Sequence, residues 1–138
     1  MSQLPLNLEP DMLERVVSFN QSVVGIAPRP LTPFAPDEKA WMVRVLQEEA
    51  DELGEATTVV DQVDALVDSI IFAMGGLYRL GLTHEQATRC FNAVMDANFE
   101  KKAGQKAGRV IGQVSDAVKP EGWVGPEARI AEILHVQG

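Results

Sequence analysis

The stretch DQVDALVDSIIFAMGGLYRLG, residues 61–81, sets the fold class of this chain. Apolar side chains recur along it at helical spacing, at positions 63, 66, 67, 70, 74 and 77. This period predicts an amphipathic helix from about Asp61 to Leu80. Gly81 follows at the point where a left-handed backbone residue usually ends a helix. The centre of the chain is therefore predicted to be a long helix with one apolar face.

Further helices are predicted on both sides of this one. Toward the N-terminus, a helix over about 37–56 with Asp37 as its N-cap follows a proline-rich loop, and a helix over about 10–24 precedes that loop. Toward the C-terminus, Thr83 and Gln86 match a capping box that opens a helix over 84–102. Gly125 and Pro126 precede a short helix that ends near His135.

No segment alternates like a strand, so the predicted fold class is all-α, a bundle of four to five helices. We expect a single domain over 1–138 with a long loop at about 103–125. Trp123 lies in this loop within the sequence KPEGW. A tryptophan there either pins the loop to the core or belongs to a functional lid.

Composition narrows the classes of function. The chain has 138 residues and a net charge of -8, so a broad basic face for nucleic acid is excluded. The apolar run that begins at Leu66 contains Asp68 and Arg79 and is too short and too charged for a membrane span. The N-terminus lacks the pattern of a signal peptide, and the lone Cys90 excludes an internal disulfide. We expect a cytoplasmic protein with neither nucleic acid nor a membrane as partner.

Carboxylates interrupt the apolar faces of two predicted helices. In QEEADELGEA, residues 47–56, Glu48, Glu49 and Glu52 share one side of the helix, and Glu49 falls within the apolar stripe. On the next helix, Asp64 and Asp68 are four residues apart, and Asp68 again lies among apolar residues. Two helices packed side by side would bring these acids into one patch.

This acidic patch has two possible explanations. Acidic residues on a helix commonly form a solvated face. Buried carboxylates close together instead raise one another's pKa and need a counter-charge, and no lysine or arginine occurs from residue 47 to residue 68. A hard divalent cation, Mg²⁺ or Mn²⁺, would satisfy such oxygen ligands and would also suit a phosphate substrate.

An ordered set of motifs resembles a known family. Phe19-Asn20, Arg44 ahead of Glu48-Glu49, DALVDSIIFAMGGLYRLG, ANFEKK and KPEGW follow the order found in MazG-like all-α nucleoside triphosphate pyrophosphohydrolases. These enzymes are relatives of the dimeric all-α dUTPases and of phosphoribosyl-ATP pyrophosphohydrolase. The resemblance extends roughly from Val16 to Ile130. One motif departs from the family pattern E-x-x-D, since Ala65 stands where the glutamate is expected. Whether Asp64 or another acid replaces it stays open.

The resemblance implies an enzyme that hydrolyses a nucleoside triphosphate or its deoxy form to the monophosphate and pyrophosphate. It implies Mg²⁺, with Mn²⁺ as a substitute, held by the acids of both helices, and Glu48 and Glu49 as catalytic residues, Glu48 as the general base. The implied metal ligands are Glu48, Glu49, Glu52, Asp64 and Asp68.

For the substrate, the resemblance implies a base pocket at Phe19, Asn20, Trp41 and Arg44, with a lean toward dGTP or GTP. Asn98 and Lys101 would bind the triphosphate, and Lys119 and Trp123 would belong to a lid. It also implies a homo-oligomer, a tetramer with a dimer as the fallback. The alternatives are a non-catalytic helical oligomerisation or nucleotide-binding module and a phosphoribosyl-ATP pyrophosphohydrolase.

Overall fold

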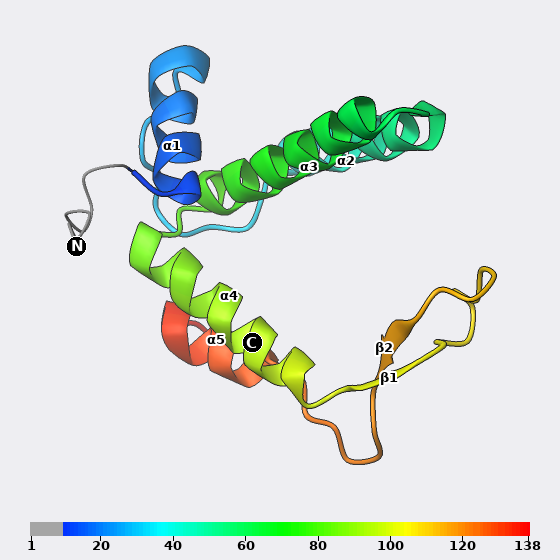
Figure 1. The fold of residues 1–138 in the computed structure, drawn as a ribbon. Coiled ribbons are helices and arrows are strands. Elements are labelled where there is room, and N and C mark those ends of the chain that lie inside the picture. Colours follow the sequence, from blue (N-terminus) through cyan, green and yellow to red (C-terminus); the bar gives the residue numbers. More distant parts are fainter. Residues whose placement is uncertain (1–9) are drawn as a thin grey trace, which may run out of the picture. The chain divides into compact units, whose positions relative to one another are not determined.

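The computed structural model describes residues 10–138, and most of them lie in helices (Figure 1). The all-α class predicted from the sequence is confirmed. In the described part of the chain, no helix is both long enough and apolar enough to cross a membrane. The chain divides into two compact units, Met1–His84 and Glu85–Gly138.

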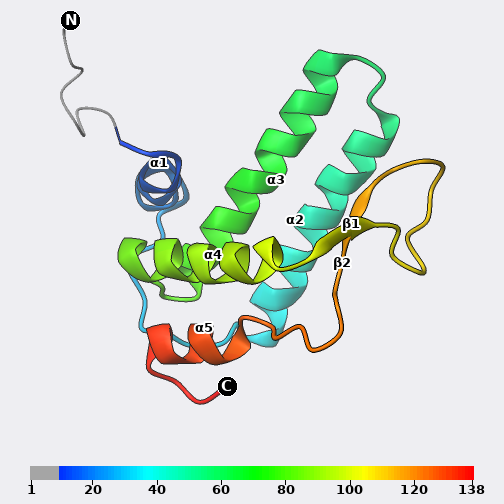
Figure 2. The same ribbon diagram turned by 60° about the horizontal axis from the view of Figure 1, so that its bottom comes forward.

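The first unit contains three α-helices and one π-helical turn. They are α1 (Met12–Phe19), the π-turn η1 (Asn20–Val24), α2 (Pro36–Glu55) and α3 (Val59–Arg79). Helices α2 and α3 lie side by side, and α1 packs against α3 (Figures 1 and 2). The three predicted helices of this region are therefore present, and the predicted helix over about 10–24 changes to π-helical geometry in its last five residues.

Side chains cap two of these helices. Asp11 accepts a hydrogen bond from the Glu14 backbone N–H at 2.7 Å, and Thr58 accepts one from the Asp61 backbone N–H at 3.1 Å. The prediction of Asp37 as the N-cap of α2 was wrong. The N-cap position is Ala35 and the helix begins at Pro36, because the fixed φ of proline suits the first helical position.

The buried residues of the first unit are few. Its buried apolar side chains include members of all three α-helices: Val16, Met42, Val45, Ala65 and Tyr78. The apolar stripe of α3 is only partly covered within the chain. Its exposed members, each with about half of its surface accessible, are Val63, Leu66, Val67 and Ile70.

The loop between η1 and α2 is tied to the C-terminal end of α3. The Tyr78 hydroxyl donates to the carbonyl of Ile26 at 2.8 Å, and the backbone N–H of Thr32 donates to the carbonyl of Leu80 at 3.0 Å. Gly81 has a φ of +96°, which confirms the predicted left-handed helix end. The backbone of Pro30 lies against it, so a side chain at position 81 would clash.

The second unit is built on α4 (His84–Phe99) and α5 (Glu127–Leu134). Arg129 of α5 donates to the carbonyl of Ala93 at 3.3 Å and pairs with Asp96 at 3.7 Å, which ties the two helices together. The short C-terminal helix predicted after Pro126 is thus confirmed, and His135 ends it with a φ of 55°.

The predicted loop at about 103–125 contains a small hairpin. Strand β1 (Lys102–Gly104) pairs antiparallel with β2 (Asp116–Val118), with Lys102 opposite Val118. The prediction that the chain has no strand was therefore wrong. Three residues are too few to show the alternation that identifies a strand in a sequence.

Candidate functional site

Three carboxylates from α2 and α3 converge in the first unit. Glu49 and Glu52 lie one turn apart on α2, and Asp68 faces them from α3. One oxygen of each lies within 4.8 Å of the others. We call this group the carboxylate cluster. The sequence predicted that these two helices would bring their acids together, and for these three residues the structure does so.

Glu49 is the buried member of the carboxylate cluster. Only 8% of the residue is exposed, and its Oε2 atom has no hydrogen-bond partner among the described residues. Burial raises the pKa of Glu49, and the neighbouring carboxylates of Glu52, Asp68 and Asp64 raise it further. A buried carboxylate oxygen without a partner costs free energy, which a bound cation would recover.

No basic side chain in the described part of the chain pairs with this cluster. Among residues 10–138, the ion pairs of lysine and arginine involve other acids. A cluster of carboxylates with a buried, unpartnered oxygen therefore fits a hard divalent cation. The solvated-face explanation does not account for Glu49.

The other two predicted metal ligands lie differently. Asp64 is exposed but close enough to Glu49 for its charge to raise the Glu49 pKa. Glu48 lies outside the cluster, although it is one helical turn from Glu52. Its side chain is 59% exposed and pairs with Arg44 at 3.4 Å. The structure thus brings together Glu49, Glu52 and Asp68, and leaves Glu48 outside.

A cavity of about 750 Å³ adjoins the carboxylate cluster. Glu49 and Asp68 both line it, and most of the remaining lining is apolar or aromatic. A volume of this size is typical of small-molecule sites, which are mostly apolar with a few polar groups. Three of the predicted base-pocket residues line it: Phe19, Asn20 and Trp41. The fourth, Arg44, does not, and its side chain is 80% exposed.

Asn20, the first residue of the π-turn, lines this cavity. It is 5% exposed, and its Nδ2 donates to the carbonyl of Val16 at 2.9 Å. The amide lies against Gly75 of α3, where a Cβ would come within 3.2 Å of Nδ2. Asn20 follows the buried Val16 by four residues, so regular helical spacing already places its amide on the inner face of the helix.

An arginine that the sequence analysis had not assigned to the site also lines this cavity. Arg79, at the end of α3, places its guanidinium 4.2 Å from the ring centroid of Trp41. Trp41 in turn meets Phe72 edge to face, with ring centroids 6.2 Å apart. From the sequence, Arg79 served only as a charge that argues against a membrane span. Its position within an otherwise apolar run was the sequence feature that could have marked it as a site residue.

The phosphate-binding and lid residues predicted from the sequence belong to the second unit. The Nζ atoms of Lys101 and Lys119 lie 4.8 and 4.9 Å from the ring centroid of Trp123. The indole N–H of Trp123 donates to the carbonyl of Ala97 at 2.7 Å. Asn98 is the next residue on α4. Trp123 therefore pins its loop to α4, and its membership of a functional lid stays a prediction.

A second group of titratable side chains lies at the start of α1. His84 Nε2 is 2.8 Å from Asp11 Oδ2 and 3.7 Å from Glu14 Oε1, and all three residues are exposed. We call this group the histidine cluster. The hydrogen bonds to the Glu14 backbone and to His84 lower the pKa of Asp11. Each acid here already has a partner.

Cys90 is buried in α4. Burial raises the pKa of its thiol, which disfavours the nucleophilic thiolate. A cysteine-based reaction at this position is not supported.

No protein-family model matches the chain, and the search of curated proteins returned no match. The function of this chain therefore has to be inferred from its own side chains.

Proposed function

We propose that this chain is a metal-dependent pyrophosphohydrolase of nucleoside triphosphates, converting an NTP or dNTP and water to the monophosphate and pyrophosphate. The single observation that carries the proposal is the buried, unpartnered Oε2 of Glu49 beside a large, mostly apolar cavity that contains three aromatic rings. A cation site next to a pocket for a planar ring suits a substrate that has both phosphates and a base. The motif order supports the same reaction.

Glu49, Glu52 and Asp68 would hold Mg²⁺, or Mn²⁺ in its place, through their carboxylate oxygens. When bound, the ion would offset phosphate charge and lower the pKa of a coordinated water. Asp64 lies near enough to add negative charge to the site. Glu48, predicted from the resemblance to be the general base, forms its contact with Arg44 instead. Glu49 is therefore the stronger candidate for the essential catalytic carboxylate.

The cavity would take the base of the nucleotide. Phe19, Trp41 and Phe72 offer aromatic surface for stacking, and the Asn20 amide offers a polar group. The lean toward dGTP or GTP comes from the resemblance. For the triphosphate, the resemblance implies Asn98, Lys101 and Lys119, and in the second unit taken by itself both lysines lie against Trp123.

A homo-oligomer, with a tetramer favoured over a dimer, is part of the proposal. Val63, Leu66 and Ile70 form an exposed apolar stripe on α3, and a second copy of the chain would cover it. An enzyme acting on nucleoside triphosphates would also be expected in the cytoplasm, where these substrates occur.

The test is a panel of ribo- and deoxyribonucleoside triphosphates incubated with the protein and Mg²⁺ or Mn²⁺, with the products separated by chromatography. The expected products are monophosphate and pyrophosphate. Diphosphate and orthophosphate as the primary products would contradict the proposed reaction. Absence of any Mg²⁺-dependent pyrophosphate release would instead favour a non-catalytic nucleotide-binding or oligomerisation module. Turnover restricted to phosphoribosyl-ATP would favour the third alternative.

A further inference from the structure

The guanidinium of Arg79 is held rigidly at the wall of the cavity. Its side chain is 11% exposed, and its Nη1 donates to Glu38 Oε2 at 3.0 Å. The Trp41 ring supports the guanidinium at 4.2 Å. An arginine with an ion pair and an aromatic platform loses little further rotamer freedom when it binds a ligand.

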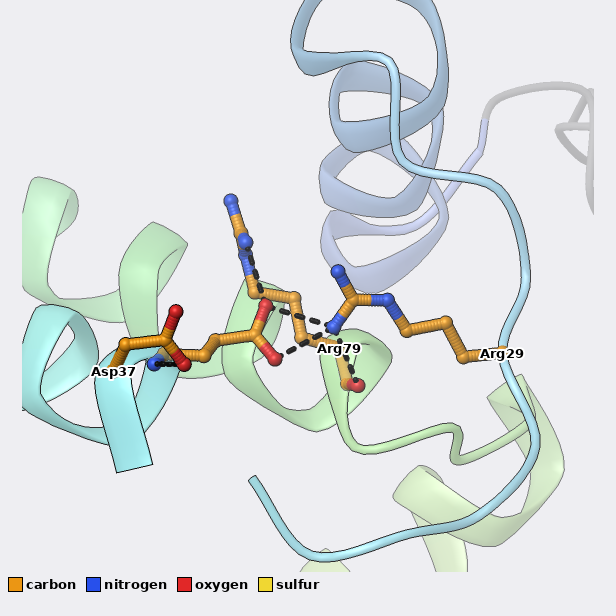
Figure 3. A network of polar contacts seen from close by, with 4 residues as sticks. Arg29, Asp37 and Arg79 are labelled. Atoms are coloured by element: carbon orange, nitrogen blue, oxygen red, sulfur yellow. Dashed lines mark hydrogen bonds and ion pairs between the residues drawn. The ribbon is translucent and has the colours of Figure 1, made fainter. Parts of the chain in front are cut away.

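Glu38 is held in turn by a second arginine. Arg29 Nη1 donates to both carboxylate oxygens of Glu38, at 2.6 and 2.7 Å, and lies 3.4 Å from the carbonyl oxygen of Arg79 (Figure 3). These hydrogen bonds from Arg29 are the main reason that the pKa of Glu38 is lowered, and Arg79 lowers it further. Glu38 therefore remains a carboxylate between two guanidinium groups.

One carboxylate between two guanidinium groups leaves a net positive charge. It also leaves most of the donors of Arg79 uncommitted. Of its five N–H donors, the described residues occupy one, through Glu38. Arg79 lines the cavity, whereas Arg29 does not. The network therefore presents a fixed, donor-only group to a mostly apolar pocket.

We propose that Arg79 determines base specificity in this cavity, and that Glu38 and Arg29 are positioning residues that hold it. This inference rests on the proposed nucleotide function. A guanidinium fork pairs best with a ring edge that presents two adjacent acceptors. Guanine has such an edge at O6 and N7, and cytosine has one at O2 and N3. Adenine and uracil place donors beside their acceptors, so they would bind less well.

The test compares Arg79→Lys, Glu38→Gln and Arg29→Gln with the wild-type protein. Calorimetry would measure binding of GMP, CMP, AMP and UMP, and steady-state kinetics would measure KM and kcat for the four triphosphates. Arg79→Lys keeps the charge but removes the fork. We expect it to weaken binding of GMP, CMP or both by about tenfold or more, with AMP and UMP changed less than about twofold.

The positioning variants sharpen the test. Glu38→Gln and Arg29→Gln should weaken binding of the same nucleotides in the same order, but by a smaller factor than Arg79→Lys. KM should rise and kcat should stay nearly unchanged. Neither side chain lines the cavity, so a base-selective effect would have to act through Arg79. Arg109→Lys is the matched control, since Arg109 also pairs with an acid at 3.0 Å but lies in the second unit. It should leave base preference as in the wild type.

The possible outcomes distinguish a failure of the specificity role of Arg79 from a failure of the proposed hydrolase function. Equal loss for all four bases in Arg79→Lys, or no loss at all, would overturn the specificity role while hydrolysis continued. If Arg79→Lys fails to fold, unaltered base preference in both Glu38→Gln and Arg29→Gln would overturn it instead. A wild-type protein that neither binds the monophosphates nor hydrolyses the triphosphates would remove the proposed function itself.

Discussion

The carboxylate cluster and the histidine cluster lie in the same unit and use similar side chains, but only one lacks partners. In the histidine cluster, Asp11 caps α1 and pairs with His84, and these contacts lower its pKa. In the carboxylate cluster, Glu49 is buried with an oxygen that nothing in the described chain satisfies, and its pKa is raised. The surroundings therefore lower the pKa of an acid in the histidine cluster and raise the pKa of an acid in the carboxylate cluster.

This difference shows how a site can be distinguished from a structural ion pair. Counting acids does not separate the clusters, because each contains two or three carboxylates whose oxygens lie within a few ångströms. Accounting for the partners of each polar atom does separate them. A group whose charges are already paired contributes to the fold, whereas a buried oxygen left without a partner is the better candidate for a ligand.

The largest expected effect comes from neutralising one acid in each cluster. Glu49→Gln keeps the size of the side chain but removes its charge and a metal ligand. We expect Mg²⁺ affinity and turnover to fall about a hundredfold or more. Asp11→Asn, the matched change in the histidine cluster, should leave both near the wild-type values. Isothermal titration with Mg²⁺ and pyrophosphate release would measure the two effects.

The comparison would fail if the two variants behaved alike. An active Glu49→Gln protein with unaltered metal affinity would mean that the buried carboxylate is not a ligand. A strong loss of metal binding in Asp11→Asn would instead place the cation at the histidine cluster.

A smaller effect is expected on thermal stability. Because Mg²⁺ would bind only the folded state, a concentration a hundredfold above its dissociation constant should stabilise the wild-type protein by about 2.7 kcal/mol. Asp68→Asn should lose most of this gain, and Asp11→Asn should keep it. Thermal unfolding with Mg²⁺ and with a chelator would show the difference.

The chelated proteins provide the control for that measurement. Without metal, Asp68→Asn should melt at the wild-type temperature or slightly above it, since one of three repelling charges has been removed. A wild-type melting temperature that is indifferent to Mg²⁺, Mn²⁺ and chelator would count against an interior cation site.

The smallest effect concerns pH and the histidine cluster. The pKa of Asp11 is lowered in the folded state, so its charge stabilises the fold at neutral pH, and this contribution disappears as the pH falls through that lowered pKa. Asn at position 11 can still cap α1 but carries no charge. Asp11→Asn should therefore melt about 2 °C or less below the wild type at pH 7, and the gap should close in acid. A gap that widens in acid would contradict this sign.

The sequence identified the helices because their periods and end signals are local. One or two helical turns of sequence are enough to predict the left-handed end at Gly81 and the shared face of the acids on α2 and on α3. Asp37 was wrongly predicted as the N-cap because the neighbouring Pro36 is also a favoured residue at the start of a helix, and it takes the first helical position. The β1–β2 hairpin was missed because each strand has three residues.

The site was predicted less completely, for a physical reason. Glu49 could be singled out by its place in an apolar stripe, but the outward direction of Glu48 depends on how α2 packs against α3. Arg79 was missed because its role depends on Trp41 and Glu38, which lie about forty residues away along the chain. Contacts of this range leave no periodic trace in a sequence.

The close approach of Asn20 to Gly75 has a consequence for how the protein could evolve. Gly75 forms part of the cavity wall, and even a methyl group there would press on the Asn20 amide. A larger residue at position 75 would therefore have to displace the Asn20 amide, which is the polar part of this wall. Substitutions there could change the shape of the cavity and keep the carboxylate cluster intact, so the two features could diverge by separate mutational steps.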